Sequence, residues 1–530
     1  MQIKESVSYE DFGAVGDGIT DDTAAIRAAH EYANEHDCPV VLNSGKKYYF
    51  PPIDEPITIK TDTDFSDAEI IIDDMNLTSD NPKRNIGLFN VRSKYPSLCF
   101  TEANSEIVRQ INANGGLDKD SFKKLDLGLG YKAMLKIEND NSRTFIRYGP
   151  NQNAGHQQKD VVLVDAEGNV DPSTPLHFSY ERISAIYVYR ADEPTMTIRG
   201  GVFHLRANQE ASSYKYFNRN INYQRCNLVI DGLTYRITDE RTGRYEGQPY
   251  CSFFLTENCH NVLIQNCRID AHRTYYAVGS GGSEVGMGAK SISAVNCNQI
   301  TYKNCIQTNF FTDETKTAIA SELWGIMSSN YSKNISFIDS TLSRFDAHCG
   351  IYNGTVKGCT IQGIRIVGEG TLTIEDCEFY APNKANTFIS TREDFGSFWR
   401  GNIFVKNISF HTCGDWPVLL MTGHWYNHNF GYKTVMPDEF VIDNFRIDSD
   451  NEIQVINNGF IKELRNSILD EVPKVKKDEN GNEITVYEKN KNPMSPPKKF
   501  VIKNCDPNAR FVFPDKNTEL FFANTEYVIE

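Results

Sequence analysis

A short alternating phrase recurs along most of the chain. Its copies lie about 30–40 residues apart, a spacing typical of solenoid and array proteins. Within each copy, Ile, Val, Thr and Phe alternate with polar residues, which is the pattern of a half-buried strand. The copies begin at Thr195, Asn227, Asn261, Gln299, Asn334, Thr371, Asn402 and Glu439. Because a lone strand cannot bury its apolar face, the copies must stack, and the pattern predicts a coil of stacked strands.

A glycine, amide or acidic residue lies in the middle of each copy. These residue types tolerate the backbone conformations of sharp bends, so the chain is expected to bend there. The residues are Gly201, Gly232, Asn266, Asn304, Asp339, Asp376, Asn407 and Asn444.

The composition favours one elongated domain over residues 1–530. A hydrophobic content of 40% in a chain of 530 residues is enough to bury a long core. No apolar run approaches the roughly 18–20 residues of a membrane span. A net charge of −15 argues against nucleic acid and anionic membranes as partners.

Four regions differ in their pattern. We expect an N-terminal cap and first coils over 1–60, loop-rich coils over 61–190, and regular rungs over 191–470. Residues 471–530 are expected to form a hairpin and a last rung, because Lys477-Asp-Glu-Asn-Gly-Asn-Glu is a turn sequence between short strands.

The chain begins without the apolar stretch of a signal peptide. Its location therefore stays open. A cytoplasmic protein or a phage-particle component is expected from the sequence as it stands, and a secreted or cell-surface protein if a leader has been removed.

The 13 cysteines fit a packing role rather than disulfides. Cys267, Cys305 and Cys377 occupy the same position of the repeat, where stacked thiols would fill a column of the core. No Cys-x-x-Cys pair has zinc spacing, so no structural zinc is expected.

The segment from Asp11 to Ala29, DFGAVGDGITDDTAAIRAA, resembles the N-terminal signature of the pectate-lyase-like superfamily. That superfamily includes polygalacturonase-type hydrolases, polysaccharide lyases and phage tailspikes. The resemblance implies a right-handed parallel β-helix that acts on polysaccharide. Thr20, Asp21 or Asp22 is expected to cap a helix that begins near Thr23 and covers the open end of the coil.

Two segments share the sequence Asp-Ala-His, and each follows a copy of the repeat. Asp270 with His272 and Asp346 with His348 are spaced two apart, so on an extended strand both side chains of a pair point the same way. We expect Asp346, His348, Asp270 and Glu322 to be catalytic. Asp346 would be the acid or base, and Glu322 or Asp270 the second carboxylate that glycosidic hydrolysis requires.

The neighbouring turns supply further polar and aromatic residues. All four tryptophans lie between residues 324 and 425, and indole rings suit stacking on the C–H faces of sugars. The residues expected to bind substrate are His272, Arg273, Arg344, Arg392, Trp324, Trp399, Asp415, Trp416, His424 and Trp425. Arg273 and Arg344 would hold the carboxylate of a uronic acid. No metal site is expected, because His424 and His428 lack helical spacing and a fixed acidic partner.

Hydrolysis of a polysaccharide or oligosaccharide without a cofactor is therefore the first functional hypothesis. The polygalacturonase-type motifs Asn-Thr-Asp, Gly-His-Gly and Arg-Ile-Lys are missing, which leaves substrate and mechanism open. The first alternative is a polysaccharide lyase that acts by β-elimination, with calcium as a cofactor. The second alternative is a non-catalytic glycan-binding phage tail or surface fibre protein. A monomer or a homotrimer is compatible with these hypotheses.

Overall fold

The computed structural model confirms an all-β, right-handed parallel β-helix with an N-terminal capping helix. It divides into two compact units, Met1–Asn141 with Lys159–Arg344, and Ser142–Gln158 with Phe345–Glu530. The structure describes residues 4–145, 156–279, 282–308, 325–381, 387–392, 395–412, 417–421, 434–447, 452–457, 468–490, 494–506, 509–512 and 518–530.

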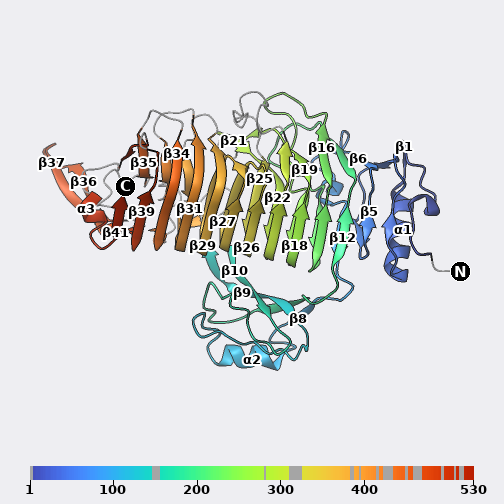
Figure 1. Cartoon of the computed structure of the whole chain (residues 1–530), viewed down its shortest axis with the longest axis horizontal. Coiled ribbons are helices and arrows are strands. Elements are labelled where there is room, and N and C mark those ends of the chain that lie inside the picture. Colours follow the sequence, from blue (N-terminus) through green and yellow to red (C-terminus); the bar gives the residue numbers. More distant parts are fainter. Residues whose placement is uncertain are drawn as a thin grey trace. The chain divides into compact units, whose positions relative to one another are not determined.

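The first unit contains three columns of parallel strands, whose successive rungs lie side by side in Figure 1. The first column is β4 (Ile57–Ile59), β7 (Phe89–Arg92), β14 (Ile221–Gln224), β17 (Phe254–Glu257), β22 (Ala289–Val295) and β25 (Gly325–Asn330). The second is β2 (Val40–Val41), β5 (Thr63–Asp64), β12 (Met196–Arg199), β15 (Leu228–Asp231), β18 (His260–Gln265), β23 (Asn298–Lys303) and β26 (Ser332–Ile338). The third is β1 (Asp17–Asp21), β3 (Lys47–Phe50), β6 (Glu69–Asp73), β13 (Val202–Arg206), β16 (Thr234–Thr238), β19 (Arg268–Asp270) and β24 (Ile306–Thr308).

The recurring phrase stacks in register, as its spacing predicts. Met196 pairs with Leu228, Leu228 with Val262, and Val262 with Ile300. All four are buried, so equivalent apolar side chains of successive copies form one column of the core. A short antiparallel hairpin, β20 (Tyr275–Val278) and β21 (Glu284–Met287), leaves the coil.

The predicted bends have left-handed backbone conformations and are joined by hydrogen bonds. Asn266 and Asn304 have φ values of 55° and 50°. The Asn304 side chain donates to Asn266, and that of Asn266 donates to Asp231, both at 2.7 Å. The bend residues of successive rungs thus form a ladder of side-chain amides.

The N-terminal motif forms a structural cap, as expected. Helix α1 (Thr23–His36) follows β1, and a 3₁₀ turn, Glu10–Phe12, precedes that strand. The side chain of Asp22, at the N-cap position, accepts hydrogen bonds from the Val15 and Gly16 amides instead of from the helix. Asp21 accepts from the Thr23 amide. The acidic residues of the motif therefore shape the loop before the helix.

An inserted lobe occupies most of the region 61–190, where loop-rich coils were expected. Regular rungs continue to β7, and the segment before β7 contains a 3₁₀ turn (Pro82–Asn85). The chain between β7 and β12 forms the lobe. The lobe contains helix α2 (Glu106–Ala113) and an antiparallel sheet in the order β10 (His156–Val164), β9 (Ala133–Phe145), β11 (Ala185–Arg190) and β8 (Leu98–Phe100) (Figure 1). This expectation was wrong because a sheet without a repeat carries no periodic signal in the sequence.

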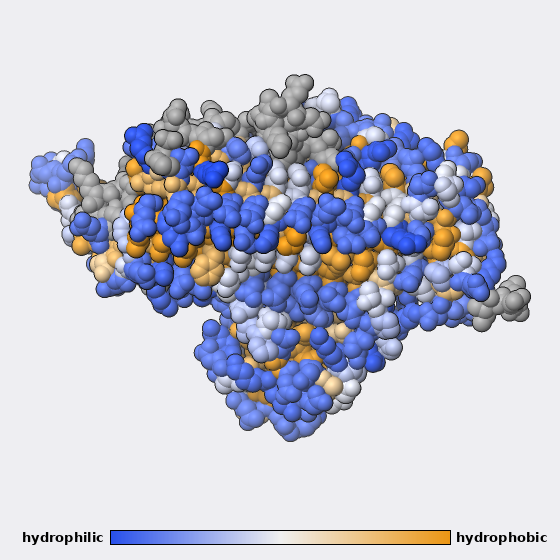
Figure 2. Space-filling model, in the orientation of Figure 1, coloured by the Kyte–Doolittle hydropathy of each residue, from blue (hydrophilic) through white to orange (hydrophobic). Residues whose placement is uncertain are grey.

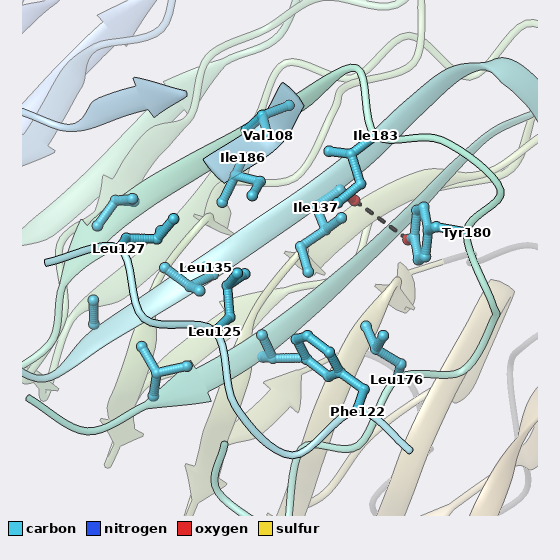
Figure 3. Packing of buried hydrophobic residues seen from close by; sticks show 14 residues of the cluster. Val108, Phe122, Leu125, Leu127, Leu135, Ile137, Leu176, Tyr180, Ile183 and Ile186 are labelled. Atoms are coloured by element: carbon cyan, nitrogen blue, oxygen red, sulfur yellow. Dashed lines mark hydrogen bonds between the residues drawn. The ribbon is translucent and has the colours of Figure 1, made fainter. Parts of the chain in front are cut away.

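The lobe has a hydrophobic core of its own, shown in Figure 3. Val108 from α2 packs with Leu135, Ile137 and Ile186 from the sheet. The Tyr180 hydroxyl donates to the Ile137 carbonyl at 3.3 Å, which satisfies a polar group inside this cluster. On the face seen in Figure 2 the lobe is mostly hydrophilic, as expected for a small folded layer that encloses its apolar side chains.

A buried ion pair joins the lobe to the rungs of the first unit. Lys333 of β26 lies 2.8 Å from Asp160 of β10, and both side chains are enclosed. Lys333 also donates to the Pro175 carbonyl, while Asp160 accepts from the Val161 and His177 amides. These bonds compensate both charges in the interior.

The second unit continues the same kind of stacking. Its strands are β27 (Arg344–Lys357, from Phe345), β28 (Thr360–Ile361), β29 (Gly363–Tyr380), β30 (Thr387–Thr391), β31 (Trp399–His411), β32 (Val418–Met421), β33 (Thr434–Val435), β34 (Glu439–Ile447), β35 (Ile453–Asn457), β38 (Met494–Ser495), β39 (Lys499–Lys503), β40 (Phe511–Val512) and β41 (Glu526–Ile529). Leu372, Ile403 and Phe440 pair in register, which again matches the repeat.

The C-terminal part agrees with the predicted elements. Strands β36 (Glu471–Lys477) and β37 (Glu483–Lys489) form the expected hairpin, and β39 is the expected last copy of the phrase. A short helix, α3 (Thr518–Phe521), precedes β41. The cysteines in the described ranges are free thiols, and Cys259 and Cys297 stack with their sulfurs 3.5 Å apart.

Candidate functional site

A cluster of charged and aromatic side chains in the second unit is the candidate site. Asp346 and His348 come from β27, and Arg392 follows β30. His348 Nε2 lies 2.9 Å from Asp346 Oδ1. One terminal nitrogen of Arg392 donates to both oxygens of Asp346, at 3.3 and 3.1 Å. The structure thus brings together three of the predicted site residues around one carboxylate.

The three side chains differ in their access to solvent. Asp346 is 0% exposed, whereas the side chains of His348 and Arg392 are 23% and 16% exposed. The carboxylate therefore lies beneath the imidazole and the guanidinium. The expectation that Asp346 itself donates a proton to a glycosidic oxygen needs correction, because the structure encloses its oxygens. Asp346 can instead orient His348 and hold the Arg392 charge in place.

The turn after β30 fixes Arg392. The Arg392 amide donates to the Ile366 carbonyl, and the Arg392 carbonyl accepts from the amides of Phe395 and Ser397. The hydroxyls of Thr391 and Ser397 are bonded at 2.6 Å. This network sets the direction in which the guanidinium leaves the backbone.

Two aromatic residues of the site were not predicted. The Phe395 ring stacks on the His348 ring, with their centroids 5.2 Å apart and their planes at 11°. The Arg392 guanidinium also lies over the Phe395 ring. His156 lies 5.3 Å from Phe395. Phe395 stands three residues after the predicted Arg392, so the turn was recognised but its aromatic residue was overlooked. His156 had no signal, because it lies outside the repeats.

Two predicted site residues near the first Asp-Ala-His segment have structural roles instead. His272 is buried and bonded to Glu240 at 3.1 Å and to the Tyr235 hydroxyl at 3.2 Å, so it does not face substrate. The Arg273 guanidinium donates to the carbonyls of Arg241 and Gly243, which leaves it badly placed to hold a substrate carboxylate.

The prediction for Trp399 is also wrong. Its ring is fully buried, and its indole N–H donates to the Asn402 carbonyl at 3.2 Å. A ring enclosed in the core offers no face to a sugar. Trp399 therefore belongs to the packing of β31.

Two other predicted residues are half-buried. One oxygen of Asp270 accepts from the Ile237 amide at 3.1 Å, and Arg344 is the first residue of β27. The remaining expected residues lie outside the described ranges: Glu322, Trp324, Asp415, Trp416, His424 and Trp425.

Two further features, a metal site and a membrane-spanning helix, concern the described residues. Among them, no group of three or more His, Cys, Asp or Glu side chains is arranged to hold a metal ion. None of the helices formed by these residues is both long and apolar enough to cross a membrane.

Solved structures with a similar chain path were found. The exopolygalacturonase of Thermotoga maritima aligns with a TM-score of 0.37 and 10% identity, over 92% of this chain and 95% of its own. The tailspike protein gp49 of Pseudomonas phage LKA1 aligns with a TM-score of 0.34 and 12% identity, over 86% and 83%. PfbA, a surface adhesin of Streptococcus pneumoniae, aligns with a TM-score of 0.33 and 12% identity, over 86% and 91%. TM-scores this low assign no activity to the chain.

The sequence was compared with two further sets of proteins. No protein-family model matches the chain, and no curated protein matches it in sequence.

Proposed function

We propose that this protein is a carbohydrate-active enzyme that cleaves glycosidic bonds of a polysaccharide at the Asp346–His348–Arg392 cluster. The observation that carries the proposal is an enclosed carboxylate that holds a partly exposed imidazole beside a partly exposed guanidinium. This arrangement gives a group able to exchange protons and a fixed positive charge at one place on the coil.

His348 is the proposed catalytic residue. With its Nε2 proton donated to Asp346, Nδ1 is the basic nitrogen of the ring. A histidine can give or take a proton near neutral pH, as the breaking of a glycosidic bond requires. Asp346 is a positioning residue, since it acts through His348. Arg392 is placed to bind an anionic group of the substrate, such as the carboxylate of a uronic acid.

Hydrolysis is the first candidate reaction. It needs an acid at the leaving oxygen and a second group that activates water or attacks the anomeric carbon. In this reaction His348 protonates the leaving oxygen, and Glu322 remains the proposed carboxylate.

β-Elimination is the second candidate, and one observation favours it. The imidazole and the guanidinium reach the surface whereas the carboxylate does not. A base that removes the proton beside a uronate carboxylate, and a cation that binds this carboxylate, are the groups that elimination uses. The bond to the leaving oxygen then breaks as a carbon–carbon double bond forms.

Product analysis of the wild-type protein tests the proposal and separates the two reactions. The protein is incubated with a panel of neutral and uronic-acid polysaccharides, with calcium chloride and with a chelator in parallel. Hydrolysis releases reducing ends without ultraviolet absorbance, and elimination releases both together. Binding of a polysaccharide without release of any product would contradict the enzymatic proposal and favour a glycan-binding fibre.

A further inference from the structure

A polar cleft lies in the first unit where the inserted lobe leaves and rejoins the coil. Its cavity of about 350 Å³ is within the usual range of small-molecule sites. The floor comes from β4, β7 and β14, and the wall comes from residues 93–97 and 189–193. A second cavity of about 380 Å³ shares Lys60, Tyr95 and Glu193 with it. We call the first cavity the lobe cleft.

The floor of the lobe cleft carries a fixed cation. Arg92 and Gln224 are neighbours in register on β7 and β14. One terminal nitrogen of Arg92 donates to the carbonyls of Val91 and Asn222, which holds the guanidinium against the sheet. Gln224 donates to Glu257 at 2.5 Å, so this amide is oriented as well. Burial lowers the pKa of Arg92 to about 10, so it remains charged at neutral pH.

The wall carries aromatic rings. Arg190 lies over the rings of Tyr95 and Tyr131, at 4.3 and 4.6 Å, and its Nε donates to Asp192 at 2.7 Å. Tyr189 lines the cleft beside Arg190 and is half-buried. Tyrosine rings with apolar faces and polar edges suit a ring that carries hydroxyls, and Arg190 keeps Tyr95 in place.

Lys60 and Glu193 lie at the junction between the lobe and the coil, and only Lys60 is accessible to a ligand. Lys60 is half-buried, and its ammonium group makes no hydrogen bond or ion pair with the described residues. Glu193 is buried, and one of its oxygens accepts a hydrogen bond from the Ser93 hydroxyl at 2.9 Å and forms an ion pair with Arg225 at 2.8 Å. Its other oxygen, Oε1, is enclosed without a hydrogen-bond partner among the described residues. Because Oε1 is enclosed, a ligand does not reach it, and Glu193 instead holds the junction together through Ser93 and Arg225.

We infer that the lobe cleft binds an anionic sugar residue, separately from the site around His348. The acid group of the sugar meets Lys60 and Arg92, and the sugar ring lies against Tyr95 and Tyr189. Neither the coil nor the lobe supplies this set alone, so the insertion creates the site.

Ligand-observed NMR titrations with sodium glucuronate, glucose 6-phosphate and glucose test the inference. We expect at least one of the two anionic sugars to bind and glucose to bind at least tenfold more weakly. Binding of glucuronate identifies a carboxylate as the acid group, and binding of glucose 6-phosphate alone identifies a phosphate.

Lys60→Met keeps the apolar stem and removes the charge, so we expect it to weaken binding of the anionic sugar about tenfold or more. Lys60→Arg should restore most of the affinity. Lys124→Met, at an exposed lysine of the lobe outside the cleft, is the matched control and should bind as the wild type does. In a protein that also carries His348→Gln, Lys60→Met should weaken binding by the same factor, which separates this inference from the proposed enzymatic site. Equal binding of glucose, absence of binding by both anionic sugars, or full affinity in Lys60→Met would overturn it.

Discussion

At the scale of single residues, Asp346 shows how a β-helix keeps a charge inside its wall. A carboxylate removed from water needs compensating partners, and Arg392 and His348 provide them within 3.3 Å. Removing one partner leaves the carboxylate enclosed and uncompensated. The cluster is therefore expected to contribute to stability as well as to the proposed chemistry.

Arg392→Met should lower the free energy of unfolding by about 3 kcal/mol, the lower end of the range for breaking a buried ion pair, because Arg392 also reaches solvent. Denaturant titration measures the change. Arg400→Met is the matched control: Arg400 is exposed and 3.8 Å from Glu369, so its loss should cost less than about 1 kcal/mol. Equal effects of the two substitutions would show that the Asp346 pair is not enclosed.

The buried His30 side chain should make the stability of the N-terminal cap sensitive to acid. His30 lies in α1 and is buried, with its Nε2 3.0 Å from the Tyr9 hydroxyl. Burial lowers the pKa of His30 to about 3, against about 6.5 in an unfolded chain. Below pH 6.5 the unfolded state binds a proton that the native state excludes, so stability is full above that pH and is lost as the pH falls toward 3. Between pH 7 and pH 4 this one group should lower the free energy of unfolding by roughly 3 kcal/mol.

His30→Gln removes the titrating ring and keeps a polar group near Tyr9. Its free energy of unfolding should fall less steeply than that of the wild type over this pH range, measured by denaturant titrations at pH 7 and pH 4. His36→Gln, at the end of the same helix, should keep the steep dependence of the wild type. Identical slopes for His30→Gln and wild type would contradict an uncharged buried His30.

The pairing of Asp346 with His348 could be predicted because two positions on a strand share a side. The burial of Asp346 could not be predicted, since it depends on Arg392, a residue 46 positions later in the chain. The same limit explains His272. Its spacing from Asp270 was correct, but its partners Glu240 and Tyr235 belong to the preceding rung.

At the scale of elements, the bends between strands are the most regular feature of the coil. Asn407 has φ of 55°, donates to Asp376 at 2.8 Å and accepts from Asn444 at 2.9 Å. Asparagine tolerates this conformation and also extends the ladder in both directions. The positions of these bends could be predicted from the sequence because each depends only on its own repeat and on its two neighbours.

Asn407→Ala should destabilise the second unit by about 1–2 kcal/mol, since it places a β-carbon in the left-handed region and removes two ladder bonds. Asn407→Gly keeps the conformation and removes only the bonds, so it should cost about half as much. Thermal and denaturant unfolding measure both variants. A glycine variant less stable than the alanine variant would contradict this explanation of the bend.

At the scale of the whole molecule, the inserted lobe is the feature that could not be predicted from the sequence. Its strands are irregular in length and antiparallel, so they give no period, and only tertiary contacts such as Lys333 with Asp160 reveal where the lobe attaches. The repeat, by contrast, predicted the coil and its register up to β39, on which β41 stacks as a further strand. A regular solenoid can be predicted from its sequence repeat, whereas an insertion shows in the sequence mainly as an interruption of that repeat.

Lys333→Met should lower the free energy of unfolding of the first unit by about 3–5 kcal/mol, because Asp160 would remain buried without its cation. Combining it with Asp160→Asn should recover part of this loss, since the amide carries no charge. Equilibrium unfolding followed by circular dichroism measures both variants. A double variant less stable than Lys333→Met would show that the charge of Asp160 is compensated elsewhere.

The proposed enzymatic site depends most directly on His348. The decisive measurement is the initial rate of product release from the polysaccharide that the wild type cleaves, for His348→Gln and for His411→Gln. His411 is the matched control, because it is a histidine of the same unit that stacks on Tyr380 outside the cluster. We expect His348→Gln to lose about a hundredfold or more of the rate with unchanged folding, and His411→Gln to keep it. Wild-type rates in His348→Gln would contradict the proposed role of this histidine.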